Sequence, residues 1–145
     1  MRNEEFRKHI TAVTERHGSL EKACNRCGAC CHPEIAISGT RVVVKGIGCK
    51  YLACGEDGKS TCTVYPRRHE LAPWCATLRR GLVISLFPDD CPYVDGLPHY
   101  HGPEALSSFK YDIVAPLIRE RLAGEVCPPW ADPDAWDRYL RGTDR

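Results

Sequence analysis

Eight of the ten cysteines in this 145-residue chain fall between residues 24 and 75, and this grouping constrains the fold more than any other feature. Four of them stand in one run, Cys24-Asn-Arg-Cys27-Gly-Ala-Cys30-Cys31. Thiolates two residues apart on a turning backbone can converge on one metal or cluster, because such a loop brings both sulfurs to the same side. Eight thiols are enough for two four-thiolate sites, so we expect a fold that depends on an inorganic centre. The predicted ligands are Cys24, Cys27, Cys30, Cys31, Cys49, Cys54, Cys62 and Cys75.

The alternative to metal binding is a disulfide framework, which an even number of cysteines in a short chain would suit. The charged N-terminal residues 1–9 lead into no apolar segment, and no stretch approaches the ~18 apolar residues of a membrane span. We therefore predict a cytoplasmic protein whose thiols stay reduced and free to ligate metal. Adjacent Cys30 and Cys31 also fit a disulfide framework poorly, because neighbouring side chains point apart.

The composition predicts a small α+β domain that needs the metal for stability. Apolar residues make up 43% of the chain, but that share includes the cysteines, and 11 prolines and 12 glycines interrupt regular structure. We expect one domain over residues 1–145, with a cysteine-cluster region at 24–75 and a C-terminal helical region at 103–142. The net charge of +1 gives no support to binding of nucleic acid or of an anionic membrane.

Apolar spacing and turn residues predict the elements around the cysteines. Residues 3–17 have a helical apolar stripe and end at Gly18, with His9 and His17 expected on the surface. Residues 34–38 and 41–45 are predicted to form a hairpin around a Gly39-Thr40 turn. The remaining predictions are a buried strand at 82–87, a helix at 104–122 that Pro116 kinks or divides, and a short helix from Asp132-Pro133 to about Gly142.

Two kinds of centre fit the cysteine spacing. The run Cys24-x2-Cys27-x2-Cys30 has the spacing with which ferredoxins bind a cluster, the last cysteine often preceding proline, as in Cys91-Pro92 and Cys127-Pro128. Structural zinc would instead pair two cysteines of the run with two of the later ones. We prefer an iron–sulfur cluster slightly over zinc, and one centre over two. His32 is a lesser candidate ligand, while Tyr65 and Arg67 or Arg68 are expected beside the sulfurs.

The cysteine pattern resembles a known family. The chain reads Cys24-x2-Cys27-x2-Cys30-Cys31, then Cys49-x2-Leu52, then Cys62-Thr-Val-Tyr65, and finally a basic stretch, a proline and Cys75. This order resembles the YkgJ-like cysteine-cluster family, which is described as a zinc- or iron-chelating domain with a CxxCxxCC signature. The resemblance spans about residues 24–75 and implies metal binding, but no reaction. Cys54 is extra to the family pattern, and the spacing from Arg67-Arg68 to Cys75 is longer than the family's.

Three classes of function remain open at this stage. The first is electron transfer or metal and cluster handling, in which the bound metal ion or cluster acts directly. The second is a module that recognises a protein partner and uses zinc only for its structure. The third is an enzyme. The sequence shows no glycine-rich phosphate loop and no His-Glu-x-x-His helix, so any catalysis would have to take place at the bound metal. We expect the first class. The sequence leaves the reaction, the partner, the pathway and the oligomeric state undecided.

Overall fold

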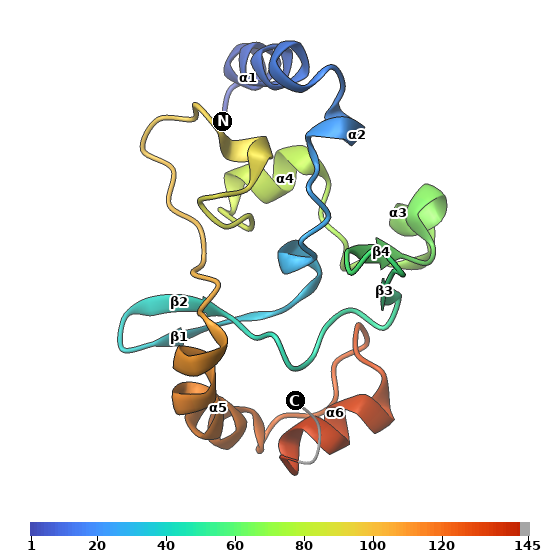
Figure 1. Ribbon diagram of the computed structural model, residues 1–145, viewed down its shortest axis with the longest axis vertical. Coiled ribbons are helices and arrows are strands. Elements are labelled where there is room, and N and C mark those ends of the chain that lie inside the picture. Colours follow the sequence, from blue (N-terminus) through green and yellow to red (C-terminus); the bar gives the residue numbers. More distant parts are fainter. Residues whose placement is uncertain (143–145) are drawn as a thin grey trace.

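The computed structural model describes residues 1–142 and has an α+β fold, as predicted. Residues 143–145, which the predicted domain includes, lie outside the described residues. In Figure 1 the N-terminal helices occupy one end of the molecule, the first hairpin and the C-terminal helices occupy the other, and the first cysteine run connects the two. The elements are α1 Asn3–His17, α2 Leu20–Ala23, η1 Ala29–Cys31, β1 Glu34–Ile37, β2 Thr40–Val43, β3 Leu52–Cys54, β4 Ser60–Cys62, η2 Tyr65–Arg67, α3 Arg68–Leu71, α4 Leu78–Val83, η3 Pro92–Val94, α5 Ser108–Leu122 and α6 Pro133–Leu140.

Helix α1 matches the sequence prediction at both ends. Gly18 follows the helix with a φ of 89° and donates its backbone N–H to the Thr14 carbonyl, at 2.7 Å. Val13 is fully buried, as the apolar stripe predicts. The expectation of a surface position for His9 was wrong, because His9 is buried and its Nε2 lies 2.5 Å from the Tyr93 carbonyl oxygen. This bond ties α1 to the segment that contains η3.

The first hairpin forms as predicted, but its turn lies one residue earlier in the chain. Ile37 pairs with Thr40, so Ser38 and Gly39 make the turn and Thr40 begins β2. Their φ values of 50° and 83° are both positive, as a two-residue turn between twisted strands requires. At its other edge, β2 is joined by Glu104, which accepts from the Val43 N–H at 2.9 Å and donates to the Arg41 carbonyl at 2.8 Å.

The cysteine-rich segment contains a second hairpin that the sequence pattern did not reveal. Strands β3 and β4 pair antiparallel, with Leu52 opposite Cys62 and Cys54 opposite Ser60. The strands have three residues each, too few for alternation to be read from the sequence. Short helices η2 and α3 then lead to Cys75.

Residues 82–87 were predicted to form a buried strand, and this prediction was wrong. Leu82 lies in α4, which Thr77 caps by accepting a hydrogen bond from the Arg80 N–H. Leu82 and Phe87 are buried, whereas Val83 and Ile84 are exposed. A short apolar run is compatible with either a strand or a helix, and here the cap at Thr77 favours the helix.

Helix α5 begins four residues later than predicted, because Ser107 provides its N-cap. The helix continues through Pro116 to Leu122 and is therefore not divided. Pro116 and Asp112, whose carbonyl loses its helical partner, are both exposed, so water can replace that hydrogen bond. The side buried in the core carries Tyr111, Ala115 and Ile118. The apolar residues spaced four apart, Phe109, Ile113 and Leu117, are exposed instead.

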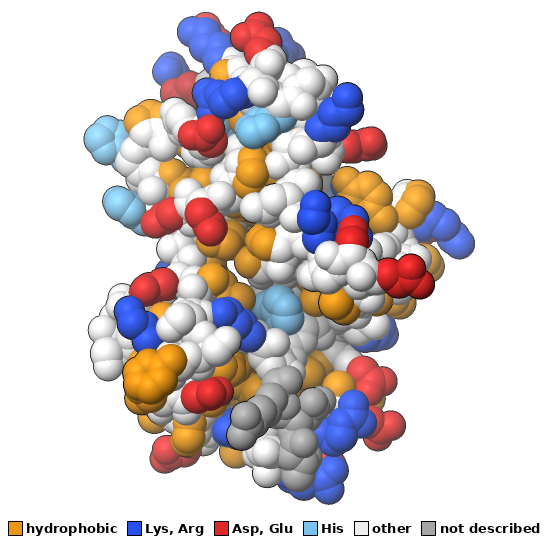
Figure 2. All heavy atoms as spheres, in the orientation of Figure 1, with side chains coloured by type: hydrophobic (Ala, Val, Ile, Leu, Met, Phe, Trp, Pro, Cys, Tyr) orange, Lys and Arg blue, Asp and Glu red, His pale blue; other side chains and the backbone are white. Residues whose placement is uncertain are grey.

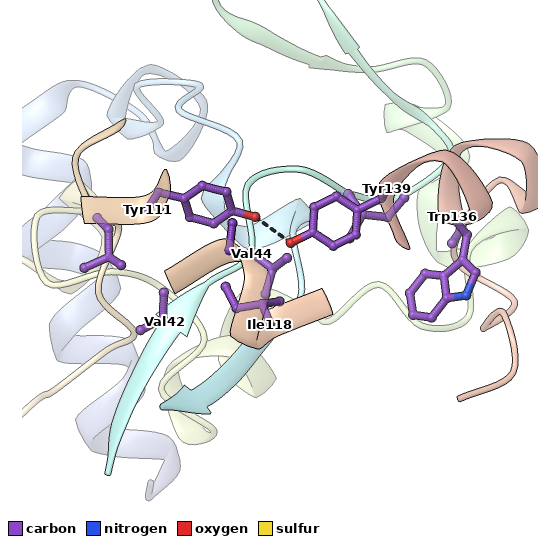
Figure 3. Close-up of a cluster of buried hydrophobic side chains, with 10 residues drawn as sticks. Val42, Val44, Tyr111, Ile118, Trp136 and Tyr139 are labelled. Carbon is purple, nitrogen blue, oxygen red and sulfur yellow. Dashed lines mark hydrogen bonds between the residues drawn. The ribbon is translucent and has the colours of Figure 1, made fainter. Parts of the chain in front are cut away.

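A hydrophobic core joins the first hairpin to α5 and α6. Val42 and Val44 from the hairpin segment belong to one buried cluster with Ile118 of α5 and with Trp136 and Tyr139 of α6 (Figure 3). The buried hydroxyls of Tyr111 and Tyr139 lie 2.7 Å apart and hydrogen-bond to each other, which satisfies both groups. Helix α6 starts as predicted, with the Asp132 carboxylate accepting from the Ala135 N–H at 3.0 Å.

A second, smaller core lies at the N-terminal end of the molecule. It consists of Leu82, Phe87, Cys91 and Val94, with Phe6 of α1 and Tyr93 of η3 packed against it. Much of residues 24–75, including the first cysteine run and the second hairpin, belongs to neither core. Across residues 1–142, no helix combines the length and apolar character needed to cross a membrane.

Candidate metal centre

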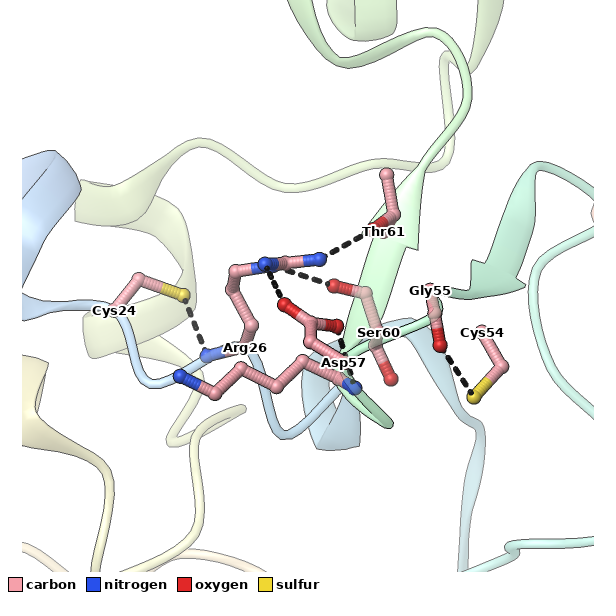
Figure 4. Close-up of polar contacts among 8 residues, drawn as sticks. Cys24, Arg26, Cys54, Gly55, Asp57, Ser60 and Thr61 are labelled. Carbon is pink, nitrogen blue, oxygen red and sulfur yellow. Dashed lines mark hydrogen bonds and ion pairs between the residues drawn. The ribbon is translucent and has the colours of Figure 1, made fainter.

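The side chain of Arg26 fastens the first cysteine run to the second hairpin (Figure 4). Its guanidinium donates to the Ser60 carbonyl at 3.0 Å, to Asp57 Oδ2 at 2.8 Å and to Thr61 Oγ1 at 2.6 Å. In return, the Arg26 carbonyl accepts from the Ser60 N–H at 2.9 Å. The two cysteine-bearing segments are thus held together by hydrogen bonds that do not involve sulfur.

Gly28 allows the closest approach between these segments. Its φ is 78°, and a Cβ placed there would lie 2.3 Å from Ser60 Oγ and 2.8 Å from Ser60 Cβ. Both the backbone conformation and the space therefore require glycine. Directly after it, η1 places Cys30 and Cys31 on a tight turn, in which the Cys31 N–H donates to the Gly28 carbonyl at 2.9 Å.

One set of thiols lies between η1 and the second hairpin. The Cys49 N–H donates to the Cys31 carbonyl at 2.7 Å, and the Trp74 indole N–H donates to Cys49 Sγ at 3.3 Å. Trp74 is itself stacked on Tyr51, with ring centroids 6.0 Å apart. We call this set the second thiol group, and it comprises Cys31, Cys49, Cys62 and Cys75. The first thiol group, nearer the N-terminal end of the molecule, is described below.

Electrostatic effects link these four thiols to one another and to Cys30. Burial raises the pKa of Cys75, Arg68 lowers it, and the thiols of Cys30, Cys62 and Cys49 raise it further. The Cys31 pKa is raised first by its hydrogen bond with Cys30, then by burial, and also by Cys49 and Cys75. In the same bond, Cys31 lowers the pKa of Cys30 to about 7.

A second set of thiols gathers at the N-terminal end, and it includes a cysteine from outside the predicted region. Burial raises the pKa of Cys91 to about 12, with further increases from the thiols of Cys27, Cys30 and Cys24. Partial desolvation likewise raises the pKa of Cys27, and Cys30, Asp90 and Cys24 add to this effect. We call this set the first thiol group, and it comprises Cys24, Cys27, Cys30 and Cys91.

One sulfur of the first thiol group accepts a local backbone hydrogen bond. Cys24 Sγ accepts from the backbone N–H of Arg26 at 3.4 Å. The backbones of Ala29 and Tyr93 lower the pKa of Cys27 and of Cys91, respectively, against the larger effect of burial. Such bonds stabilise a thiolate and are one way in which proteins tune sulfur ligands.

Two cysteines belong to neither thiol group. Cys54 is exposed on β3, and its thiol donates to the Gly55 carbonyl at 3.6 Å (Figure 4). Cys127 lies at the C-terminal core, where its thiol donates to the Pro128 carbonyl at 3.6 Å. Seven of the eight predicted ligands, all except Cys54, thus take part in an electrostatic effect on the pKa of a cysteine.

The residues that were expected to assist the cysteines at the metal make other contacts. His32 Nδ1 lies 2.8 Å from the Ile47 carbonyl oxygen, so this nitrogen helps to fix the loop. Tyr65 is exposed, with the Arg68 guanidinium 4.1 Å from its ring centroid. Arg67 pairs with Glu70 on the surface.

The thiols are neighbours without forming a closed coordination shell. Within residues 1–142, no three His, Cys, Asp or Glu side chains are arranged so that they could hold a metal ion as they stand. The donor set nevertheless suits a soft metal, because it consists of thiols, and N–H donors are directed at two of the sulfurs, Cys24 and Cys49. Binding would require the thiols to rotate toward a shared centre and to lose their protons.

Sequence reasoning missed two residues of this region, Trp74 and Arg26, and named Cys91 only as a candidate. Cys91 lies 16 positions beyond Cys75, and only its following proline marked it as a candidate. Trp74 and Arg26 follow no recognisable spacing, because their roles depend on contacts made across the fold.

Comparison with known proteins gives one relative of this chain. An uncharacterized protein from Methanocaldococcus jannaschii is 34% identical over 83 residues, which are 57% of this chain and 59% of that protein. The match therefore covers less than two thirds of the relative. No family model matches the chain. No solved structure matches it either.

Proposed function

We propose that this chain is a cysteine-cluster metal protein that binds an iron–sulfur cluster or zinc through thiolates. The observation that carries the proposal is the convergence of cysteines from four separate segments, η1, the loop before β3, β4 and the loop after α3. Their thiols influence one another, and the Trp74 N–H is directed at Cys49 Sγ. A purely structural set of reduced cysteines would have no reason to bring these sulfurs together.

An iron–sulfur cluster remains the preferred centre. The Cys24-x2-Cys27-x2-Cys30 spacing supports it, and so does the N–H···S bond at Cys24, because hydrogen bonds to sulfur are a principal means of tuning cluster potentials. The thiols of Cys24, Cys27 and Cys30 are exposed, which suits exchange of electrons or of metal with another molecule. We therefore propose a role in electron transfer or in metal and cluster handling, in the cytoplasm, where thiols stay reduced.

A second candidate function is supported by the surface of α5. Phe109 and Ile113 are 76% and 65% exposed, and Leu117 follows on the same face at 41%. Apolar residues spaced four apart on an exposed helix form a surface that can receive a protein partner. In this alternative the metal would be zinc and would serve only to hold the fold. Charges give little guidance to the partner, because Lys, Arg, Asp and Glu are interspersed on the face drawn in Figure 2.

The identity of the centre is tested by purifying the protein without oxygen and assaying iron, zinc and acid-labile sulfide. We expect a brown protein that absorbs near ~400 nm and contains sulfide. A colourless protein with stoichiometric zinc and no sulfide would select the second candidate. A protein that contains neither metal would refute both.

A further inference from the structure

We propose that two copies of this chain bind each other through the exposed side of α5, with the two α5 helices antiparallel. The apolar residues on this side are Phe109, Ile113 and Leu117, and we call it the α5 face. The inference goes beyond the proposed metal centre and does not depend on it. It gives the α5 face one occupant, a second copy of the chain, in place of an unspecified protein partner.

Helix α5 is apolar on two sides, and only one of them is covered. Tyr111, Ala115 and Ile118 are buried in the C-terminal core. The three members of the α5 face are 41–76% exposed. A surface helix of a globular protein normally has one apolar face and one polar face, and a helix that is apolar all round is normally buried. The α5 face therefore has the composition of a covered surface but no cover within residues 1–142.

The neighbouring helix α6 shows that this exposure is not general at the C-terminal end. Trp136 and Tyr139 of α6 are buried in the same core, whereas Asp134, Asp137 and Arg138 are exposed, so its outer side is charged. Helix α5 lies at the edge of the molecule in Figure 1, and apolar side chains gather at the surface over it in Figure 2. The exposed apolar residues thus belong to one helix.

Two charged residues beside the α5 face have no ion-pair partner within residues 1–142. Lys110 and Glu120 are both exposed, and neither has an oppositely charged residue three or four positions away on the helix. On α1, by contrast, Lys8 pairs with Glu4 at this spacing. The charges of Lys110 and Glu120 are therefore free to pair with those of another molecule.

The order of these residues makes the α5 face complementary to itself. Lys110 lies three residues before Ile113, and Glu120 lies three residues after Leu117, so the four positions are symmetric about Ala115. A two-fold axis brings the same surface of both copies together. In an antiparallel pair centred at this level, Ile113 lies opposite Leu117 of the second copy, and Lys110 lies at the level of Glu120 of the second copy. A parallel pair would bring like charges together, which is unfavourable.

The size of the α5 face indicates a weak dimer. Helix α5 has 15 residues and is about 22 Å long at the rise of an α-helix. One pair of such helices buries less than the ~1,200 Å² at which stable interfaces begin, so we expect association only at high protein concentration. The net charge of +1 gives the two copies little mutual repulsion.

A simpler explanation treats the three residues as ordinary surface residues. Apolar atoms contribute much of the surface of any folded protein, and single exposed apolar residues are common. This explanation gives no reason for an apolar face between two unpaired charges of opposite sign. It also predicts that the chain stays monomeric and that substitutions on α5 have no effect on its mass in solution.

The test is sedimentation equilibrium of anaerobically purified protein in a reducing buffer, in which no disulfide can join two chains. Between ~10 µM and ~1 mM, the mass of the wild type should rise from that of one chain toward that of two. Ile113→Glu should weaken association at least about tenfold, because it places carboxylates within the apolar contact. The matched control is Val83→Glu, an exposed aliphatic position on α4 that is 47% exposed, which should leave association unchanged. Circular dichroism establishes that both variants retain their helices.

Charge reversal tests the antiparallel arrangement. At low salt, Lys110→Glu and Glu120→Lys should each weaken association at least about threefold, because like charges then lie at the same level. An equal mixture of the two variants should restore it, since every reversed charge meets an opposite one on the other variant. Such a recovery cannot arise from a change in the folding of either chain.

Three results would overturn the inference. They are a wild type that stays monomeric up to ~1 mM, a dimer that Ile113→Glu leaves as stable as before, and a mixture that associates no more tightly than either charge variant alone. The proposed function fails separately, because metal content plays no part in these measurements. A metal-free wild type that still dimerises through α5 would refute the proposed function and support this inference.

Discussion

Gly28 shows at the scale of one residue how the chain brings its cysteine segments together. A side chain here meets Ser60, and the φ of 78° is already unfavourable for other residues. We expect Gly28→Ala to destabilise the protein by about 1–3 kcal/mol and to weaken metal binding, because the cysteine run must move away from β4. Thermal melting and metal titration measure the two effects.

The matched control for this variant is Gly39→Ala. Gly39 has a similar φ of 83°, but a Cβ there would meet nothing within 4 Å. The Gly39→Ala variant therefore has the strain of a positive φ without a steric clash, and position 39 lies away from the thiols. Equal loss of metal affinity in both variants would show that the approach of Gly28 to Ser60 does not position the site.

The Cys30 thiol provides a second prediction at this scale, for the metal-free protein. The hydrogen bond from Cys31 favours the thiolate and lowers the Cys30 pKa to about 7. Since the thiolate is the reactive form, alkylation of Cys30 should rise with pH through about 7 instead of through the ~8.5 of a free thiol. Mass spectrometry of iodoacetamide-treated protein measures this rate, with exposed Cys54 as the internal reference.

Replacing Cys31 by alanine removes the donor and should shift the alkylation profile of Cys30 toward higher pH. A Cys30 profile that is identical with and without Cys31 would contradict the assigned cause.

Helices whose ends are marked by capping residues in the sequence were predicted correctly. Elements without such residues nearby were not. Helix α1 ends at a glycine and α6 starts at Asp132-Pro133, so both could be located from a few neighbouring residues. The run at 82–87 lacked alternation, and the cap at Thr77 that decides its helix lies outside the run. In α5 the spacing correctly indicated a helix, but the face that it suggested as apolar is exposed, because Tyr111 and Ile118 face the core.

The second hairpin leads to a prediction at the scale of elements. Arg26→Lys keeps the charge but loses the planar fork that binds Asp57, Ser60 and Thr61 together. We expect a lower melting temperature and weaker metal binding, because the first cysteine run is no longer held against β4. The control is Arg67→Lys, since the exposed pair with Glu70 should contribute at most ~0.5 kcal/mol. A variant at position 26 that behaves like the control would show that this contact is dispensable.

At the scale of the whole molecule, the chain has a hydrophobic core at each end, and neither contains a cysteine of the second thiol group. Metal binding should therefore stabilise residues 46–77 more than burial does. Chelation should lower the melting temperature and expose this segment to protease before α5 and α6. Limited proteolysis with mass spectrometry identifies the first cleavage sites. First cleavage within α5 or α6 would contradict this order.

The positions of the cysteines in the fold show how much of the site could be predicted from the sequence. Spacing within residues 24–75 predicted eight ligands, and seven of these cysteines take part in electrostatic effects with another cysteine. Their role as ligands stays a prediction, because no three of them are arranged to hold a metal ion within residues 1–142. Spacing could not reveal that Cys54 points elsewhere on its short hairpin. It also could not assign Cys91, whose position depends on the packing of η3 against α2.

X-ray absorption spectroscopy at the edge of the bound metal shows directly whether these cysteines form a metal centre. We expect sulfur to fill the ligand shell, with metal–sulfur distances of ~2.3 Å, whichever metal is present. A cluster would add a metal–metal distance, and zinc would not. A shell of nitrogen or oxygen ligands at ~2.0–2.1 Å, or protein with no stoichiometric metal, would contradict the claim that these cysteines form a metal centre.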